Sequence, residues 1–364
     1  MRYFPLILLL LFLHHCAQTA KSQEKTYKIN YASSLLHYSG RIKITDTAAI
    51  IYWPGSSVNF SFVGTKLIAI IADQNGQNFF DIIVDSQKVS SIKLKKGKHE
   101  YLLASSLPYR RHSLSLFKRN EYMQGKTYFF SAQTDSNGYF TNFPAPKLTI
   151  EFYGNSITAG LANLDPKGKN FSPEYEDNYL SYAARTARAL HADYYCIARS
   201  GIGLTVSWMP VIMPELFYRL DPEDSLSHWD FRRVQPNIVV VNLFQNDYWL
   251  TKRPSHPQYK RRFGQKKPDS SYFINAYYQF IDTLLKLYPH SRIICTLGPM
   301  SAVKEGSPWP GYIKAAVNKL NNPRVYTFFF PYFVKQRHPT AADHEKMAKM
   351  LIDFINNNVQ LPEK

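Results

Sequence analysis

The sequence predicts an α/β fold in which a doubly wound, parallel, five-stranded sheet follows an antiparallel β-sandwich. Two observations predict this order. From about residue 147, short apolar runs rich in β-branched residues alternate with segments whose apolar residues recur at helical spacing. Before that point, strand-like runs follow one another without a helical period of useful length. Alternating strands and helices favour a parallel sheet with helices on both faces.

Five apolar runs predict the strands of the parallel sheet, namely 148–152, 194–197, 238–243, 292–297 and 325–330. The run at 238–243 is too short for a helix and is apolar enough for a strand buried on both faces. Helical spacing of apolar residues predicts the covering helices, at 180–190, 274–285, 313–320 and about 341–357. We therefore expect the α/β domain to occupy residues 147–360.

The amino-terminal part reads as strands separated by turns. Its strand-like runs are 58–62, 67–72, 79–84 and 113–117. Turn pairs such as Asn75-Gly76 and Lys96-Gly97 interrupt them. We expect a jelly-roll β-sandwich over residues 25–143, joined to the α/β domain by the linker Pro144-Ala145-Pro146.

Residues 1–20 have the features of a signal peptide. A basic residue precedes the apolar run Leu6–Leu13, which is too short to cross a membrane. We therefore expect a secreted or periplasmic protein with no integral membrane span. Cys16 leaves a lipoprotein open, although the residues before it fit a lipid-attachment box poorly. Because Cys196 and Cys295 each lie in a predicted buried strand, we expect two core thiols and no disulfide.

The chain is strongly basic, with a formal net charge of +17. Lysines cluster on an expected hairpin at 93–98, and basic residues cluster at 260–267 in an expected long loop after the third parallel strand. Nucleic acid is the usual partner of a basic protein, but export makes that partner unexpected here. A solvated charged surface is the preferred interpretation, and an acidic polysaccharide stays open as a partner.

Ser156 lies directly after the first predicted parallel strand. Glycines at Gly154 and Gly160 let the backbone turn sharply there. The hydroxyl would then lie near the free amide groups at the start of the next helix, where negative charge can be stabilised. A serine in this place can act as a nucleophile. The alternative is a turn serine that caps a helix.

Three further groups follow other parallel strands at the same edge of the sheet, where reactive groups collect. Gly201 comes after the second strand, Asn246 after the third and His338 after the fifth. Each also has a simpler interpretation: a turn glycine, a strand-to-loop turn and a loop histidine without a task. Together with Ser156 they predict one site that combines a nucleophile, an imidazole and hydrogen-bond donors.

His344 lies six positions after His338, which is not the spacing that places two histidines on one helix face. We therefore expect no metal site, no cofactor, and a structural role for His344 at the start of the last helix.

These segments resemble the sequence blocks of the SGNH (GDSL-type) hydrolases, and specifically carbohydrate esterase family 2. The matching segments of the α/β part are 151–158, 176–180, 200–204 and 338–348. Segments that resemble the family's amino-terminal sandwich are 40–41, 53–56, 62–65 and 107–121. The resemblance implies a flavodoxin-like, three-layer fold and removal of acetyl groups from plant-type polysaccharides or oligosaccharides.

The resemblance also implies roles for individual residues. Ser156 would be the nucleophile and His338 the general base. The oxyanion hole would be formed by the backbone amides of Ser156 and Gly201 and the side chain of Asn246. In chemical terms, the histidine would take the serine proton and the three donors would stabilise the tetrahedral oxygen.

Three places depart from the family pattern. Asn155 stands where the family usually has aspartate, and Phe244-Gln245 stands where it usually has Gly-Thr. We expect the bulk of Phe244-Gln245 to reshape the acyl or sugar pocket. Lys335 occupies the usual position of an aspartate before His338, and Asp343 fits a capping pattern for the last helix. We therefore expect a Ser–His dyad whose histidine is oriented by a backbone carbonyl or a more distant acid.

Tyr248, Trp249 and Trp309 are expected in loops beside this edge, where their rings could stack on sugar faces. The alternative is that they pack the domain interface. The favoured function is a monomeric, exported carbohydrate O-acetylesterase acting on an acetylated polysaccharide or oligosaccharide. Two other functions stay open: a glycan-binding protein with a decayed esterase site, and a lipase or thioesterase on the same fold.

Overall fold

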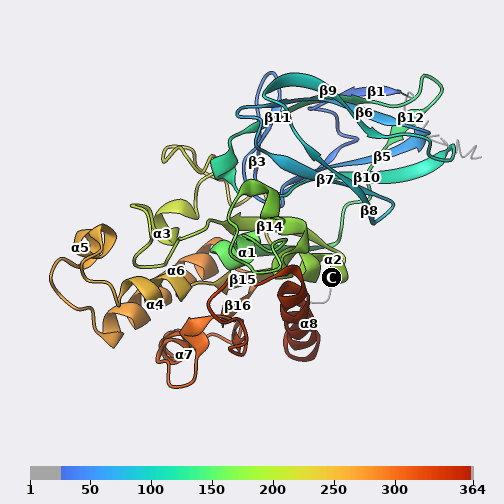
Figure 1. Cartoon of the computed structure of the whole chain (residues 1–364). Coiled ribbons are helices and arrows are strands. Elements are labelled where there is room, and N and C mark those ends of the chain that lie inside the picture. The colour runs from blue at the N-terminus through green and yellow to red at the C-terminus, as the bar shows by residue number, and fades with distance from the viewer. Residues whose placement is uncertain (1–25, 362–364) are drawn as a thin grey trace, which may run out of the picture.

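The computed structural model describes residues 26–361 and consists of a β-sandwich followed by a three-layer α/β unit (Figure 1). The expected signal peptide, 1–20, and the expected lipidation site, Cys16, lie outside the described residues. Within the described range, no helix combines the length and the apolar character that a membrane crossing requires. The expected division into ranges 25–143 and 147–360 stays a prediction.

Two antiparallel six-stranded sheets form the sandwich, as predicted. The first has the order β3-β4-β11-β6-β9 with β1 paired to β11. Its strands are β1 (Lys28–Asn30), β3 (Ile42–Ile44), β4 (Ala49–Ile51), β6 (Leu67–Asp73), β9 (Gly97–Ala104) and β11 (Thr127–Gln133). The second has the order β12-β5-β10-β7-β8 with β2 paired to β5. Its strands are β2 (His37–Ser39), β5 (Ser57–Gly64), β7 (Phe79–Val84), β8 (Gln87–Lys93), β10 (Arg110–Lys118) and β12 (Tyr139–Thr141).

Alternation along the strands decides which side chains fill the sandwich core. In β5, Val58, Phe60 and Phe62 are fully buried between the sheets, while the residues between them point to the opposite face. β10 continues the pattern with Leu114 and Leu116. The outer face of β5 and β10 therefore carries mainly small polar side chains.

The two turn pairs identified in the sequence connect the two sheets. Asn75-Gly76 joins β6 to β7, and Lys96-Gly97 leads from β8 into β9; in both cases the two strands belong to different sheets. The expectation that the lysines at 93–98 share one hairpin is therefore wrong. A strand–turn–strand pattern does not reveal whether the second strand pairs with the first or crosses to the opposite sheet.

The parallel sheet has the order β14-β13-β15-β16-β17, which is the doubly wound arrangement predicted. Its strands are β13 (Leu148–Gly154), β14 (Ala192–Ala198), β15 (Ile238–Asn242), β16 (Arg292–Leu297) and β17 (Val325–Phe329). Cys196 on β14 and Cys295 on β16 are both buried free thiols, as expected.

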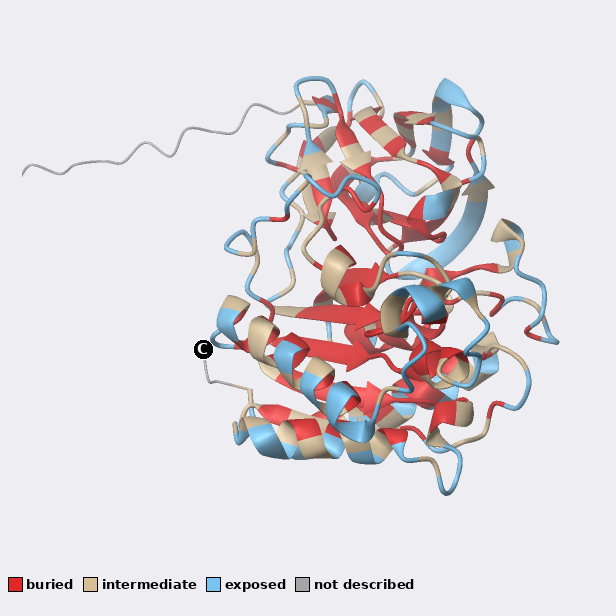
Figure 2. Cartoon of the chain, turned by 90° about the vertical axis from the view of Figure 1, so that its left-hand side faces the viewer, coloured by how far each residue is buried: buried red, intermediate tan, exposed pale blue. Residues whose placement is uncertain are grey.

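Helices cover both faces of this sheet. One face packs against α2 (Tyr182–Ala189) and α8 (Ala341–Asn358), and the other packs against α6 (Ser270–Leu287) and α7 (Trp309–Leu320). Figure 2 shows the strands between them as buried, while the exposed residues lie on the outer sides of the helices. The short helices are α1 (Ser156–Ala159), α3 (Met213–Leu216), α4 (Gln245–Leu250), α5 (Pro257–Phe263), η1 (Tyr122–Gln124), η2 (Pro173–Tyr175), η3 (Asn178–Leu180) and η4 (Ser301–Val303).

The segment after β15 differs from the expected long loop, because it contains α4 and α5. Lys260, Arg261 and Arg262 lie in the last turn of α5, where cations interact favourably with the helix dipole. Part of the basic cluster is therefore explained by local helix stability.

Candidate active site

Register in the parallel sheet brings the predicted site residues to one edge. Gly154 at the end of β13 lies level with Ala198 of β14 and Asn242 of β15. The chain continues beyond these three positions to Ser156, Gly201 and Asn246. The edge formed by the carboxyl ends of these strands is the usual location of ligands and reactive groups in such sheets.

Ser156 and His338 are in direct contact there: the Oγ of Ser156 lies 3.0 Å from the Nε2 of His338. Ser156 is the first residue of α1, and the side chain of Asn155 caps that helix by accepting a hydrogen bond from the backbone of Ile157 at 3.0 Å. The departure from aspartate at position 155 therefore preserves the cap, because both side chains offer a carbonyl-type acceptor.

A tight backbone contact fixes His338. The backbone N–H of His338 donates to the carbonyl of Gly168 at 2.9 Å, and its ring forms a T-shaped pair with Phe171, with the centroids 5.1 Å apart. Gly168 has φ +61°, and a Cβ there would come within 2.3 Å of the His338 carbonyl oxygen. Only glycine allows this close approach.

The second ring nitrogen of His338, Nδ1, donates to no acceptor among residues 26–361. The expected backbone carbonyl or distant acid that would orient the ring is thus not found in this part of the chain. Asp343 is engaged elsewhere, as expected: it caps α8 by accepting from the backbone of Thr340 at 2.8 Å, and it forms an ion pair with Arg337. The ring instead contacts Phe171 and Ser156, while the Gly168 carbonyl fixes the backbone of His338.

Burial lowers the pKa of His338 to about 4. With no carboxylate partner to favour the imidazolium, the ring is neutral at neutral pH. A neutral Nε2 beside a serine hydroxyl can accept its proton.

The backbone amides expected to face a developing anion are unengaged. Neither the N–H of Ser156 nor that of Gly201 donates to an acceptor within the described range. Gly201 has φ +79°, a left-handed backbone conformation that favours glycine. Both amides are available to a ligand.

The side-chain amide of Asn246 is held in one orientation. Its Nδ2 donates to the carbonyl of Ile202 at 2.7 Å, and its Oδ1 accepts from the indole of Trp208 at 3.0 Å. A carboxamide nitrogen has two hydrogens, so one remains for a further acceptor. The contact with Ile202 also places Asn246 beside the Gly201 loop, which comprises residues 200–206.

The neighbouring carboxylate, Asp247, binds that loop through hydrogen bonds from its backbone amides. It is fully buried and accepts hydrogen bonds from the backbone of Leu204 at 3.0 Å, of Thr205 at 2.6 Å and of Val206 at 3.2 Å. Burial raises its pKa, and the same three hydrogen bonds act in the opposite direction. The sequence marks Asp247 only as the second residue of a possible strand-to-loop turn, Asn246-Asp247.

A carboxylate from the sandwich also binds the same loop. Glu121 follows β10 and is fully buried. It accepts a hydrogen bond from the backbone N–H of Ser200 at 2.6 Å and another from the Ser200 hydroxyl. The backbone N–H of Glu121 in turn donates to Glu176 at 2.8 Å. No local sequence pattern marks Glu121 for this role.

A cleft of about 530 Å³ opens beside His338. Trp249 lines this cleft, and its indole N–H donates to the hydroxyl of Ser301 at 2.9 Å. Trp309 does not line it: the residue is only 5% exposed, and its ring packs against Phe273 with the centroids 4.8 Å apart. Tyr248 packs against Trp309 on the core side. Of the three aromatic residues expected to meet sugar, only Trp249 reaches the cleft, and none of them lies in a loop.

Phe244 also faces the core, so its bulk does not reshape the cleft as expected. Its ring lies 4.9 Å from that of Trp309, and the residue has φ +83°, a left-handed conformation in which glycine is favoured. Gln245 acts closer to the cleft, because its Oε1 accepts from the backbone of Ala302 at 3.2 Å and so holds the segment that contains Ser301.

His344 has the structural role expected of it. It is fully buried at the start of α8, and its Nδ1 accepts from the backbone N–H of Tyr182 at 3.1 Å. Burial lowers its pKa to about 3, so the ring stays neutral and links α8 to α2.

A doubly wound sheet of this order, with a serine–histidine pair at its carboxyl edge, defines a hydrolase of the SGNH (GDSL) class. A family model described as the N-terminal part of carbohydrate esterase 2 matches residues 38–144. A solved structure of a family two carbohydrate esterase from Clostridium thermocellum, in complex with cellohexaose, is 31% identical to this chain with a TM-score of 0.78. That match covers 88% of this chain and 98% of the other.

Two curated proteins are also similar. The cellulase/esterase CelE of Acetivibrio thermocellus is 32% identical over 88% of this chain, and the match spans 39% of the length of CelE. An acetylxylan esterase / glucomannan deacetylase of Cellvibrio japonicus is 25% identical over 96% of both proteins. The chain belongs to carbohydrate esterase family 2.

Proposed function

We propose that this protein is an exported carbohydrate O-acetylesterase that works through an acyl-enzyme on Ser156. The observation that carries the proposal is the 3.0 Å contact between Ser156 Oγ and His338 Nε2 beside two unengaged backbone amides. Nucleophile, base and anion-binding donors are the groups that acyl transfer needs. The leader-like sequence of residues 1–20 supports export.

In the first half-reaction, Ser156 Oγ bonds to the acetyl carbonyl carbon while its proton passes to His338 Nε2. The amides of Ser156 and Gly201 and the free hydrogen of Asn246 stabilise the oxyanion. The carbon–oxygen bond to the sugar then breaks, and the proton moves from Nε2 to the departing sugar oxygen. Water, activated by the same nitrogen, releases acetate and restores the serine.

A carbohydrate substrate is supported by the family and by the named activities of its members, which include acetylxylan esterase and glucomannan deacetylase. The cleft beside His338 provides an aromatic wall in Trp249. Aromatic rings pack well against the apolar faces of sugars. An acetylated xylan or glucomannan is therefore the first substrate to test.

The test is acetate release from acetylated xylan and acetylated glucomannan by the natural chain and by Ser156→Ala. The matched control is Ser270→Ala, since Ser270 is exposed at the start of α6. We expect Ser156→Ala to lower the rate by at least about 10³-fold while the control stays active. Glycan binding without turnover in the natural chain would favour a decayed site, and a preference for long acyl esters would favour a lipase or thioesterase.

A further inference from the structure

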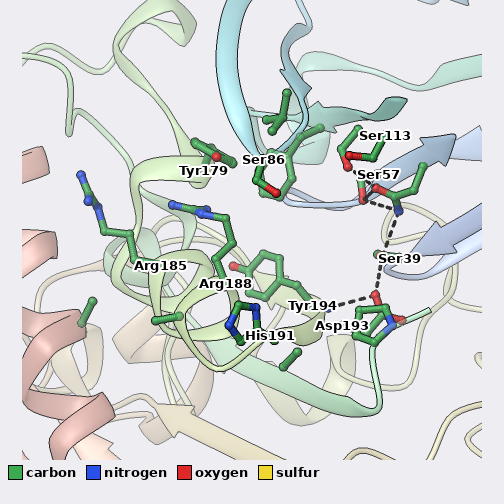
Figure 3. Close-up of a pocket in the computed structure, with 18 of the residues that line it drawn as sticks. Ser39, Ser57, Ser86, Ser113, Tyr179, Arg185, Arg188, His191, Asp193 and Tyr194 are labelled. Atoms are coloured by element: carbon green, nitrogen blue, oxygen red, sulfur yellow. Dashed lines mark hydrogen bonds between the residues drawn. The ribbon is translucent and has the colours of Figure 1, made fainter. Parts of the chain in front are cut away.

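A second cavity, of about 980 Å³, lies between the sandwich and the α/β unit. Figure 3 shows its walls: Ser57 and Ser113 come from the sandwich, and Arg185, Arg188 and His191 come from the opposite side. None of its lining residues lines the cleft beside His338. Its volume is in the range of ligand sites, roughly 300–1,000 Å³.

The cavity lies far from Ser156. It reaches Ala192 and Asp193, which begin β14, whereas Ser156 and Gly201 follow the opposite ends of their strands. A strand of this length spans roughly 20 Å. Any ligand of this cavity would therefore bind apart from the catalytic edge.

Small polar side chains form the sandwich wall. Ser57 and Asn59 of β5 and Ser113 and Ser115 of β10 alternate with core residues and point outward into the cavity. The Asn59 amide donates to Ser57 at 3.1 Å, and its oxygen accepts from Ser115 at 2.5 Å. This wall offers hydroxyl and amide groups where large apolar side chains would have closed the gap.

The opposite wall carries a cation without a counter-ion. The guanidinium of Arg188 stacks on Tyr179 at 3.6 Å, and its Nη1 is buried with no acceptor in the described part of the chain. A buried charged donor left unpaired is costly, so an anion placed here would be strongly favoured. Two arginines line the cavity. Arg185 lies 3.8 Å from the carboxylate of Glu345, whereas Arg188 forms no ion pair with any carboxylate among the described residues.

None of the acidic groups that line the cavity is paired with Arg188. Asp193 is bound by His37 at 3.1 Å and by the hydroxyl of Ser39, and Asp353 is exposed at the cavity rim. His37 also stacks on Phe143 with the centroids 5.6 Å apart, which adds a flat aromatic surface. The cavity thus combines sugar-type hydrogen-bond partners, flat rings and one free guanidinium.

We propose that this interdomain cavity is a second glycan-binding site, selective for an oligosaccharide that carries a uronate carboxylate. The carboxylate pairs with Arg188, and the sugar hydroxyls bond to the serine and asparagine wall. The site is independent of the chemistry at Ser156. It would hold an acidic chain on the enzyme while another part of a polysaccharide enters the cleft.

The test compares trigalacturonate with its fully methyl-esterified form by titration calorimetry. Both ligands are titrated into Ser156→Ala, which prevents hydrolysis. We expect trigalacturonate to bind at least tenfold more tightly than the methyl ester. Arg188→Gln, in the same background, should weaken trigalacturonate binding at least tenfold, while the exposed Arg232→Gln should not change it. Trp249→Ala, in the catalytic cleft, should leave the affinity unchanged.

A second variant, which blocks the cavity from its other wall, tests the proposal independently of whether Arg188→Gln folds. Ser113→Tyr fills the cavity from a strand position that suits tyrosine, and it should also remove binding. Equal binding of the two ligands, loss of binding through Trp249→Ala alone, or no binding at all would each overturn the proposal. Hydrolysis of p-nitrophenyl acetate by the natural chain tests the proposed esterase function separately. The esterase proposal and the glycan-site proposal can therefore fail independently.

Discussion

The Glu121 carboxylate lies 2.6 Å from the backbone nitrogen of Ser200, the residue that precedes Gly201. Glu121 belongs to the sandwich, and Gly201 contributes an amide to the proposed oxyanion hole. Because the loop is also tied to Asp247 through three backbone amides, both structural units fix the direction of the Gly201 N–H. Fixed donors stabilise a transition state without reorganisation during the reaction.

Glu121→Gln should lower kcat about tenfold with little change in KM. Glutamine keeps the size but replaces one acceptor by an NH₂ that faces a donor of Ser200, and a hydrogen bond to a charged group is worth roughly 1.5–3 kcal/mol. Steady-state kinetics with p-nitrophenyl acetate measures this change. Ser200→Ala keeps the backbone hydrogen bond and should have a smaller effect. A lower melting temperature with unchanged kcat would contradict the positioning role, and the exposed Glu305→Gln serves as the control.

The activity should persist into acid. His338 must be neutral to accept the serine proton, and burial lowers its pKa to about 4 from the ordinary 6.5. Protonation of the free enzyme, and with it the loss of kcat/KM, should therefore occur as pH falls through about 4. A pH profile of kcat/KM on a soluble ester measures the position of this limb. An inflection near 6.5 would show that the imidazole is better solvated or paired with an acid.

Phe244 allows a test of backbone strain. Its left-handed conformation costs a non-glycine residue roughly 1–2 kcal/mol, whereas loss of a buried phenylalanine ring costs roughly 3–5 kcal/mol. Phe244→Gly and Phe244→Ala should both be less stable than the natural chain. Phe244→Gly should be the more stable of the two by about 1 kcal/mol, because only glycine relieves the strain. Chemical denaturation measures the order, and a more stable alanine variant would contradict the argument.

Two tryptophans should respond differently to truncation. Trp249 lines the cleft, so Trp249→Ala should raise KM for acetylated polysaccharide several-fold while the melting temperature changes little. Trp309 is a core residue, so Trp309→Ala should cost roughly 3–5 kcal/mol of stability. Thermal melts and kinetics on both variants separate these effects. If Trp309→Ala raised KM without a loss of stability, its assignment to the core would be wrong.

The sequence predicts the parallel sheet well because each strand is a mainly apolar run, of which 238–243 is the clearest. It also locates Ser156 and His338, because strand ends in a doubly wound sheet meet at one edge. The hydrogen bond between Glu121 and Ser200 joins residues 79 positions apart, and no local pattern marks it. Contacts between two structural units depend on how those units dock, which periodicity does not encode.

The aromatic residues show the same limit. Trp309 lies between two prolines and Trp249 between Tyr248 and Leu250, and neither context shows that the first turns into the core and the second faces the cleft. The direction depends on the helix in which each lies, and neither α4 nor the first turn of α7 was predicted. Phe244 likewise gives no sign in the sequence that it adopts a left-handed conformation, because that residue type rarely does.

Glu121 also bears on how this chain tolerates dissection. A fragment cut at the linker would retain Ser156 and His338. It would lose Glu121, one of the two carboxylates that bind the loop around Gly201. The sandwich is therefore better regarded as a structural part of the catalytic apparatus than as a detachable accessory. Swapping it for the equivalent module of another hydrolase should preserve turnover only when the incoming module supplies an acid at the same place.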